Sequence, residues 1–485
     1  MDAEAFEHHL TSPQGADHVP AGARTVHAEG GACGDALTFS VAIDRGRVTD
    51  AGFSARGCGA TTAAASVAVT LIRGRSILDV ARIGPATIAD ELGGLHPGKL
   101  HAAELAADGL HRALGAAARA GAALPIDPTA TLVAMSGGVD SAVAAHLVAA
   151  SGAPTVAVTL ELWADRENDA ERSCCSASAV AQARALAHRM GLAHLTIDLR
   201  DEFRTGVVEP FIAGYAAGET PNPCVGCNGH VRLDAMLALA DRLGCARLAT
   251  GHYARTAERD SSDGPLLRTA ADPAKDQTYM LAGLDPGSLD RMRFPLGELR
   301  KPEVRRLAAQ ARLAVADKAD SQDLCFLAGT DRARFLARHG GLGDAPGEIV
   351  DASGQVLGRH LGQHRFTVGQ RRGLGLPAAD GPRFVLDKDA PGRRVVVGPR
   401  EALRTRRVAV RGARLHRRGE RVDRVKLRYR SSPVAARVAG APEAGRHRSL
   451  RLELSDPVEG AAPGQLACLM DGELVVGWGT IARLA

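Results

Sequence analysis

A glycine-rich turn at residues 136–141 has the residue types that bind a phosphate chain. An apolar run from Thr131 to Met135 predicts a buried strand, and Ser-Gly-Gly ends it before an apolar helix that we expect over Ala142 to Ala150. Glycines allow a tight turn whose N–H groups point at one anion, and the following helix adds the positive end of its dipole. It is not the common GxxxxGK[ST] loop, because no lysine follows the glycines. The alternative is an ordinary glycine-rich strand-to-helix turn. The predicted phosphate-binding site comprises Ala134, Met135, Ser136, Gly137, Gly138, Val139 and Ser141, with Asp140 as a ligand of Mg²⁺ on the phosphates.

A second stretch, residues 220–228, presents two thiols in the order Thr-Pro-Asn-Pro-Cys-Val-Gly-Cys-Asn. Its prolines predict a rigid loop without regular structure, with Cys224 and Cys227 three residues apart. A C-x-x-C pair can bind zinc or iron, or carry out redox chemistry. Cys174 and Cys175 are adjacent, which is a poor geometry for joint chelation. Cys325 is a further candidate, but only the fold could bring it to Cys227.

Near the N-terminus, Cys33-Gly-Asp35, Cys58 and Lys99-Leu-His101 combine thiols, a carboxylate and an imidazole. Together they resemble the NifU/IscU-type iron–sulfur scaffolds, whose pattern is CGD, then GCG, then K-[ILV]-H-C. The chain departs from this pattern at Ala102, where the family has a cysteine that accepts a persulfide. Zinc or a labile cluster could still bind, since all three ligand types are competent; the alternative is a degenerate scaffold kept for docking or stability. The candidate ligands are Cys33, Asp35, Cys58 and His101.

The elements around these residues alternate between strand and helix. Strands are predicted at 156–160, 195–199 and 247–250, and helices at 176–190 and 231–243. Such alternation indicates a Rossmann-like parallel sheet with its ligand at the carboxyl ends of the strands. The 136–141 turn and Thr250-Gly-His-Tyr253 both follow strands, so we expect them to share one crevice.

The fold class that we predict is a multidomain α/β protein. Before the sheet, a hairpin (36–43 and 48–53) and two helices (from Gly59, and near 102–120) indicate an α+β NifU-like domain. After it, short strands indicate a small β module and then a β-barrel with arginines on its outer face. The predicted bounds are a disordered N-terminus at 1–24, the NifU-like domain at 25–122, a linker at 123–129, the parallel-sheet domain at 130–330, the central β domain at 331–402 and the barrel at 403–485.

Charge is unevenly distributed along the 485 residues, whose net charge is +5. Residues 1–125 carry 10 Lys+Arg against 13 Asp+Glu, whereas residues 401–485 carry 17 against 9, a net of +8. A basic C-terminal module indicates a polyanionic partner, unless it is only a solvated arginine-rich surface.

No signal peptide or membrane span is visible, so we expect a cytoplasmic protein without membrane contact whose nine cysteines stay reduced.

The 136–141 turn resembles the SGGxDS pyrophosphate loop of the PP-loop ATPases. SGGVDS, TPNPC-x-x-CN, ATGHY, KDQTY, FPLGE, DSQDLCF and TVGQRRGLG occur in the order found in the bacterial tRNA-specific 2-thiouridylases. The resemblance implies an ATP- and Mg²⁺-dependent sulfurtransferase that adenylates and 2-thiolates the wobble uridine of tRNA. It also implies a sulfur donor, either a cysteine desulfurase or a sulfur-relay protein.

The same resemblance assigns roles to single residues. It places Leu160 and Gly251 around the adenosine, a persulfide on Cys325, and Cys227 as the thiol that attacks this persulfide and leaves a Cys227–Cys325 disulfide. The residues implied at the target base or tRNA are Asn222, Pro223, Cys224, His252, Lys275, Asp276, Gln277, Gln370, Arg371 and Arg372.

Cys224 leaves two chemistries open, since many relatives have aspartate there. Cys224, Cys227 and Cys325 could ligate a [4Fe–4S] cluster whose fourth iron binds hydrosulfide, or Cys325 could carry the persulfide. Alternative functions are another PP-loop ATP pyrophosphatase acting on RNA, and an RNA-binding iron–sulfur carrier. The sequence does not decide the tRNAs, the sulfur donor or the oligomeric state.

Overall fold

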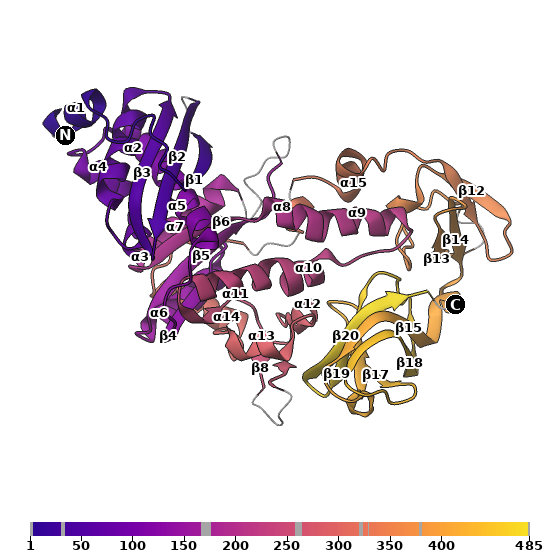
Figure 1. Cartoon of the computed structure of the whole chain (residues 1–485). Coiled ribbons are helices and arrows are strands. Elements are labelled where there is room, and N and C mark those ends of the chain that lie inside the picture. Colours follow the sequence, from indigo (N-terminus) through magenta and orange to yellow (C-terminus); the bar gives the residue numbers. More distant parts are fainter. Residues whose placement is uncertain are drawn as a thin grey trace.

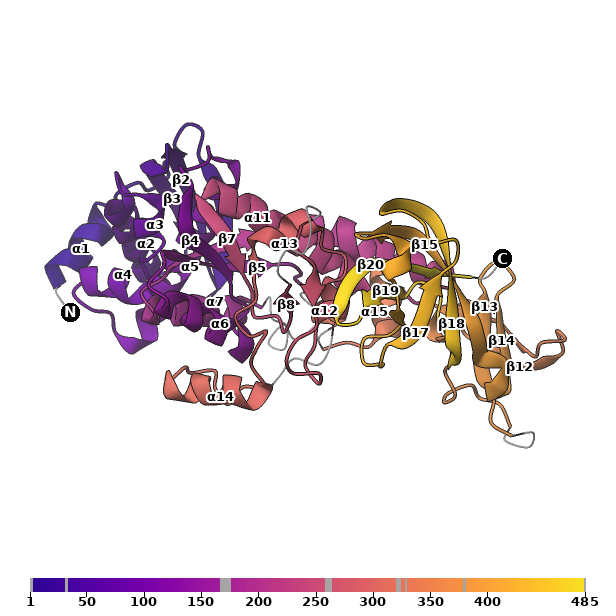
Figure 2. The same ribbon diagram turned by 90° about the horizontal axis from the view of Figure 1, so that it is seen from below.

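The computed structural model of the chain describes residues 3–30, 34–165, 176–257, 264–319, 324–327, 329–377 and 381–483. The molecule is elongated, with the N-terminal module at one end and two β domains at the other (Figure 1, Figure 2). The parallel sheet lies between them, and the two termini lie at opposite ends. Our predictions for Cys33, Cys174, Cys175 and residues 320–323 lie outside the described residues.

The N-terminal module is a three-stranded antiparallel sheet, ordered β1-β2-β3, packed against helices α2 and α5. Many positions of α2 are alanine, and Ala63, Ala64 and Ala65 are fully buried, so the helix approaches its neighbours closely. The predicted hairpin and both helices are confirmed. The elements are α1 (Ala3–Thr11), β1 (Arg24–Gly30), β2 (Asp35–Asp44), β3 (Arg47–Arg56), α2 (Gly59–Ile72), α3 (Ile77–Val80), α4 (Pro85–Glu91), η1 (Pro97–Lys99) and α5 (Leu100–Ala120).

The prediction that residues 1–24 are disordered was wrong for the part that the structure describes. Helix α1 packs on α2, and His9 Nδ1 lies 2.8 Å from Ser66 Oγ. Phe6 packs against the module's core. Tertiary contacts therefore stabilise a helix too short to be stable alone.

The central domain is a parallel sheet, as predicted, and it has five strands in the order β10-β7-β4-β5-β6. The chain builds outward from β4 to β6 and then returns to β7 on the other side of β4, so the topological switch point lies beside the end of β4. The linker before β4 spans residues 121–126, because the strand begins at Asp127, earlier than predicted. The sheet strands and their helices are β4 (Asp127–Ala134), α6 (Val139–Ala150), β5 (Thr155–Glu161), α7 (Ala177–Arg189), β6 (Ala193–Asp198), α11 (Leu233–Arg242), β7 (Cys245–Ala249), α13 (Pro286–Arg291), β10 (Met292–Arg293) and α14 (Lys301–Gln310).

The cysteine-bearing stretch is helical from Pro223 onward, which corrects our prediction of a loop. Proline is accepted at the first helical position, where no intrahelical N–H is needed. The Asn222 side chain caps the helix by accepting from the Cys224 N–H at 3.1 Å. The elements between β6 and η5 that are not yet named are α8 (Arg200–Phe203), η3 (Arg204–Val208), α9 (Glu209–Ala216), α10 (Pro223–Gly226), the π-helix η4 (Cys227–Arg232), β8 (Arg255–Thr256), β9 (Leu267–Arg268) and α12 (Thr278–Leu281).

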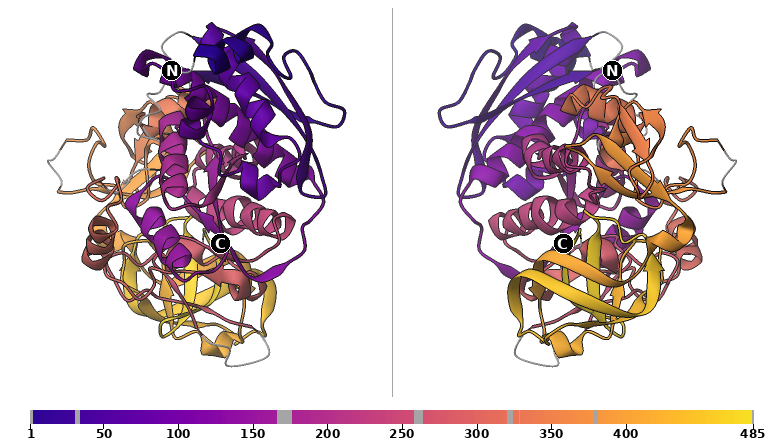
Figure 3. Two further views of the ribbon diagram at one scale, coloured as in Figure 1. Left: turned by 90° about the vertical axis from the view of Figure 1, so that its left-hand side faces the viewer. Right: turned by 90° about the vertical axis from the view of Figure 1, so that its right-hand side faces the viewer.

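The C-terminal half contains a small sheet, ordered β12-β11-β14-β13, and a closed barrel. The barrel runs β15-β18-β17-β16-β19-β20 and closes through β15–β20 pairing (Figure 3). Along β15, exposed or half-buried arginines alternate with buried apolar residues, which agrees with the predicted outward-facing arginines. Helix α15 was not predicted. The elements are η5 (Cys325–Leu327), α15 (Arg332–Gly340), β11 (Gly347–Val350), β12 (Val356–His360), η6 (Gln363–Arg365), β13 (Phe384–Asp389), β14 (Arg394–Gly398), η8 (Arg400–Leu403), β15 (Arg404–Leu415), η9 (Gly419–Arg421), β16 (Arg424–Lys426), β17 (Val434–Val438), β18 (Gly445–Glu459), β19 (Leu466–Asp471) and β20 (Leu474–Ala482).

None of the helices in the described ranges has both the length and the apolar character needed to cross a bilayer.

Candidate active site

The turn between β4 and α6 has the geometry of an anion-binding loop. Gly137 adopts a φ of +69°, and a Cβ there would lie 2.9 Å from the Ala179 carbonyl oxygen, so only glycine fits. Ser141 Oγ accepts from the Ser136 N–H at 3.1 Å and donates to the Gly138 carbonyl at 3.0 Å. These bonds hold the turn open at the positive end of α6.

Two lysines that sequence reasoning missed reach this loop from far along the chain. Lys301 Nζ lies 2.7 and 2.9 Å from the two carboxylate oxygens of Asp140, and the Tyr253 hydroxyl donates to the same carboxylate at 2.8 Å. Lys318 Nζ donates to the Gly137 carbonyl at 3.0 Å and to the Gln182 amide oxygen at 2.8 Å. The loop therefore has the cations that its own sequence lacks.

The signal that could have indicated these lysines is indirect. A phosphate loop without its own lysine needs a cation from another element, and Lys301 begins helix α14 three residues after the end of the FPLGE motif. Asp140, predicted to bind Mg²⁺, is already paired with Lys301. Any Mg²⁺ here would have to share or displace that lysine.

The ATGHY stretch lies against the loop, as predicted. A Cβ on Gly251 would lie 2.7 Å from the Ser141 nitrogen, which requires glycine there. His252 Nδ1 lies 2.9 Å from Thr250 Oγ1. Burial, with a smaller effect of the Arg232 charge, lowers the pKa of His252 to about 3, so its ring is neutral at pH 7. Leu160, at the end of β5, is 8% exposed.

A hydrogen-bonded path runs from the phosphate loop to the cysteine helix. The Tyr253 N–H donates to the Gln277 side-chain oxygen at 2.9 Å, and the Met280 N–H donates to the Gln277 carbonyl at 2.9 Å. Asn222 and Asn228 in turn donate to the Met280 sulfur (3.8 Å) and carbonyl (3.4 Å). The loop and the thiols therefore belong to one connected structure.

Some of the residues expected to touch tRNA are hydrogen-bonded within the protein, and others are exposed to solvent. Asp276 is buried and accepts from Thr278 Oγ1 at 2.8 Å, and the Gln277 side chain holds Tyr253, so both have structural partners within the protein. Lys275 is half-buried. The Gln370 side chain stabilises its own turn, because its amide oxygen accepts from the Thr367 N–H at 3.0 Å and its amide nitrogen donates to the Arg372 carbonyl at 2.9 Å. The side chains of Arg371 and Arg372 are exposed beside it.

The three predicted thiols lie in different environments. Cys227 is 6% exposed, while Cys224 and Cys325 are half-buried. Burial raises the pKa of Cys224, which therefore stays protonated at pH 7. Cys227 and Cys325 both pack against the same apolar core, and the neighbouring Phe326 lies 5.0 to 5.8 Å from the rings of three other phenylalanines.

The barrel closes over the start of the cysteine helix. Gln465 donates to the Thr220 carbonyl at 2.5 Å, and the Thr220 N–H donates to the Pro463 carbonyl at 2.8 Å. The Tyr279 hydroxyl donates to the Leu466 carbonyl at 2.9 Å. The basic module thus contacts the segment that leads into the cysteine helix.

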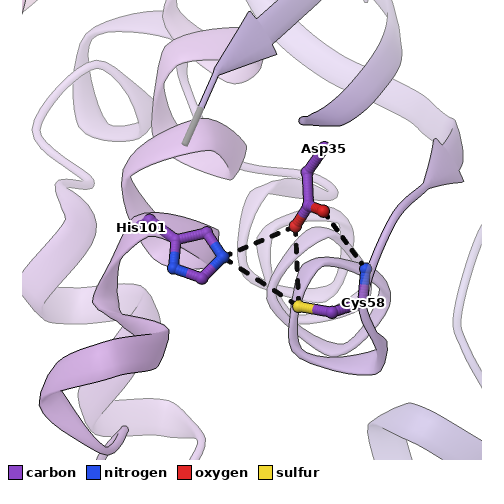
Figure 4. Close-up of side chains that lie close together, drawn as sticks. All are labelled: Asp35, Cys58 and His101. Carbon is purple, nitrogen blue, oxygen red and sulfur yellow. Dashed lines mark hydrogen bonds and ion pairs between the residues drawn. The ribbon is translucent and has the colours of Figure 1, made fainter. Parts of the chain in front are cut away.

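A separate cluster of possible metal ligands lies in the N-terminal module (Figure 4). His101 Nε2 and Cys58 Sγ each lie 3.5 Å from Asp35 Oδ2, and 4.0 Å from one another. Asp35 is 1% exposed, and the Thr61 hydroxyl, which donates to it at 2.5 Å, is the main cause of its lowered pKa. A thiol, an imidazole and an ionised carboxylate at these separations fit a tetrahedral metal ion.

Among the residues that the structure describes, no other set of three His, Cys, Asp or Glu ligand atoms lies within 4.8 Å. Cys224, Cys227 and Cys325 are therefore too far apart for one zinc ion, whose tetrahedral thiolates lie about 4 Å apart. A [4Fe–4S] cluster spaces its cysteines more widely, so that alternative stays a prediction.

Comparison with known proteins assigns a family to each of these parts. Residues 4–120 match the NifU-like N terminal domain, residues 129–329 the tRNA methyl transferase HUP domain, residues 333–399 its PRC-barrel domain, and residues 405–481 the aminomethyltransferase beta-barrel domain. A bifunctional protein NifU/MnmA from Rubrobacter xylanophilus is 43% identical over 98% of this chain and 97% of its own length. The chain belongs to this NifU/MnmA family.

Its MnmA part is shared with stand-alone enzymes. The tRNA-specific 2-thiouridylase MnmA of Frankia casuarinae is 45% identical over 72% of this chain and 98% of its own length. That of Zymomonas mobilis is 40% identical over 72% of the chain and 92% of its own length. The predicted resemblances to 2-thiouridylases and to NifU-like scaffolds are both confirmed, as is the α/β fold with its flanking domains.

Ala102 remains the point at which this NifU/MnmA chain departs from the scaffold pattern. Its side chain is fully buried against the module's core, one residue after His101. The three described candidate ligands thus lie together, and no cysteine follows His101 where the scaffold pattern has one.

Proposed function

We propose that the chain uses ATP to activate the wobble uridine of tRNA and replaces its O2 atom by sulfur, releasing AMP and pyrophosphate. The observation that carries this is the hydrogen-bonded path from Asp140 through Tyr253, Gln277 and Met280 to the cysteine helix. It joins a phosphate-binding loop to thiols in a single structure, as an enzyme that first activates and then thiolates requires.

The activation step follows from the loop. A pyrimidine O2 is a poor leaving group until it is adenylated, and adenylation expels pyrophosphate from ATP. Backbone N–H groups of residues 136–141, with Lys301 and Lys318, support the developing negative charge. Mg²⁺ on the phosphates would supply further charge neutralisation when bound.

The sulfur step uses the two thiols that pack on the same core. A terminal persulfide sulfur on Cys325 attacks C2 of the base, and AMP leaves. The Cys227 thiolate then attacks Cys325 Sγ, which breaks the S–S bond to the base and leaves a Cys227–Cys325 disulfide. An external dithiol reduces it. In the cluster alternative, Cys224, Cys227 and Cys325 would hold a [4Fe–4S] group that presents hydrosulfide to the base.

Binding of tRNA is supported by the net charge of +8 over residues 401–485 and by the exposed Arg371 and Arg372. We infer that Asn222, Pro223, Cys224 and the neutral His252 contact the flipped base. A chemistry that needs reduced thiols supports a cytoplasmic location. For the Asp35, Cys58 and His101 cluster, we propose zinc or a labile iron–sulfur cluster, with Cys33 as a further ligand.

The test is thiolation of a tRNA transcript by the intact chain with ATP, Mg²⁺, cysteine and a cysteine desulfurase. Cys227→Ser and Cys325→Ser should abolish 2-thiouridine, whereas Cys245→Ala, which changes a buried thiol in β7, should not. Release of pyrophosphate without thiolation would indicate another PP-loop reaction on RNA. Anaerobic analysis of iron, sulfide and zinc distinguishes the persulfide and cluster chemistries.

A further inference from the structure

The N-terminal module covers the open edge of the central sheet. Strand β6 is an edge strand, and its outward backbone groups are bonded by the module. The His194 N–H donates to the Ala81 carbonyl at 2.9 Å, and His111 Nδ1 lies 2.7 Å from the His194 carbonyl oxygen. A Cβ on Gly115 of α5 would lie 2.0 Å from the Thr196 carbonyl oxygen. The module is therefore docked against the edge of the sheet and supplies partners to backbone groups that would otherwise be unpaired.

A buried charge network crosses this interface. Arg112 of α5 donates to Asp108 at 2.7 Å and also to the carboxylate of Glu161 in the central domain. Arg184 of α7 donates to the other oxygen of Asp108 at 3.0 Å. The side chains of Arg184 and Glu161 are 3% and 7% exposed. Two cations thus balance two carboxylates where water has little access.

Glu161 lies at the end of the strand next to the one that leads into the phosphate loop. It is the last residue of β5, directly after Leu160, and β5 lies beside β4, where the phosphate loop begins. The Met135 N–H at the start of that loop donates to the Val158 carbonyl of β5 at 2.8 Å. A nucleotide with its phosphates on the loop extends over a neighbouring strand end, and Leu160 offers the apolar surface that an adenine ring requires.

Without Arg112, Glu161 would lose its ion pair and keep only the weaker effect of the Arg200 charge. Burial raises its pKa to about 7 even with Arg112 beside it. Loss of that cation would favour the neutral acid or draw the carboxylate toward water, and either change moves the end of β5.

We propose that Arg112 of the NifU-like module is a positioning residue of the ATP site, which it completes by fixing the end of β5 through Glu161. The inference rests on the proposed function, because it requires ATP on the 136–141 loop. It assigns the module a role in nucleotide binding that is independent of any metal at Asp35, Cys58 and His101.

The experiment compares equilibrium binding of AMP, ATP and inorganic pyrophosphate to the intact chain and to Arg112→Met. We expect AMP and ATP to bind about tenfold more weakly, since misplacing a binding surface by a fraction of an ångström has effects of this order, with pyrophosphate unchanged. The matched control is Arg119→Met. This arginine also lies on α5 and crosses the interface, but it bonds the Asp198 carbonyl at the end of β6, at 2.8 Å. It should bind all three ligands within about twofold of the wild type.

A double variant separates positioning from simple loss of packing. Arg112→Met/Glu161→Gln removes both charges together and should recover most of the AMP affinity, because no unpaired carboxylate remains. Unchanged AMP binding by Arg112→Met, equal loss of pyrophosphate binding, or no recovery in the double variant would each overturn the inference. If the wild type itself binds neither AMP nor ATP, the proposed function fails instead.

Discussion

Lys301 offers the sharpest test of how the phosphate loop works. The Lys301→Met change keeps most of the side-chain volume and removes the ammonium group that lies 2.7 Å from Asp140. If this group stabilises the departing pyrophosphate, its loss removes one preorganised charge from the transition state. Losses of that kind lower kcat by about 10²- to 10³-fold, or roughly 3 to 4 kcal/mol.

The structure predicts a much smaller effect on stability. The Asp140 side chain is 32% exposed and keeps the hydrogen bond from the Tyr253 hydroxyl, so its unpaired charge stays solvated and bonded. We therefore expect a loss of about 1 kcal/mol in the free energy of unfolding, well below the cost of breaking a fully buried pair. A large kinetic effect with a small stability effect is the expected signature.

The assay is tRNA-dependent pyrophosphate release under saturating ATP, with thermal unfolding measured on the same samples. Lys301→Arg, which keeps the charge, should retain more activity than Lys301→Met. The matched control is Arg306→Met on the same helix, because Arg306 is 73% exposed and pairs weakly with Glu303 at 3.8 Å. A kcat for Lys301→Met within about threefold of the wild type would refute the reasoning, since no preorganised charge would then have been lost.

Asp140→Ala should abolish ATP-dependent thiolation while tRNA binding persists, and equal thiolation by this variant would exclude the role of the carboxylate in the loop. Arg448→Ala, at an exposed position of β18, should flatten the slope of log K for tRNA against log salt by somewhat under one unit; an unchanged slope would show that this arginine does not contact phosphate. Burial lowers the folded-state pKa of His111 from 6.5 to about 3, so its contribution to stability is present above pH 6.5 and is lost as pH falls below that value. By pH 5 the free energy of unfolding is lower by about 2 kcal/mol for this reason. Urea unfolding of His111→Gln should lack this contribution to the pH dependence. Cys33→Ser/Cys58→Ser should lower the metal content of the module and, under limiting sulfur, the thiolation rate; metal content and rate equal to those of the intact chain would make the metal site functionally inert.

The sequence alone determined the elements whose signals are local. The strand, the Ser-Gly-Gly turn and the following helix at 131–150 are specified by hydrophobic pattern and glycine freedom within 20 residues. The alternation of strands and helices fixed the parallel sheet, and parallel strands bring their carboxyl ends to one edge. For that reason the loop and Gly251 could be predicted to meet.

The tertiary structure decided what depends on contacts between distant segments. Lys301 and Lys318 reach the loop from 161 and 181 residues away, and no local pattern records that approach. Pro223 indicated a loop until its place at the first helical position was known, because proline breaks only a helix that already precedes it. The sequence was sufficient to predict that the N-terminal module is a NifU-like domain. It was not sufficient to predict that this module docks on β6, because an edge strand has the same sequence whether water or another domain bonds to its backbone groups. Where the module meets the end of β5, the sequence supplied Arg112 and Glu161, and only the fold made them neighbours.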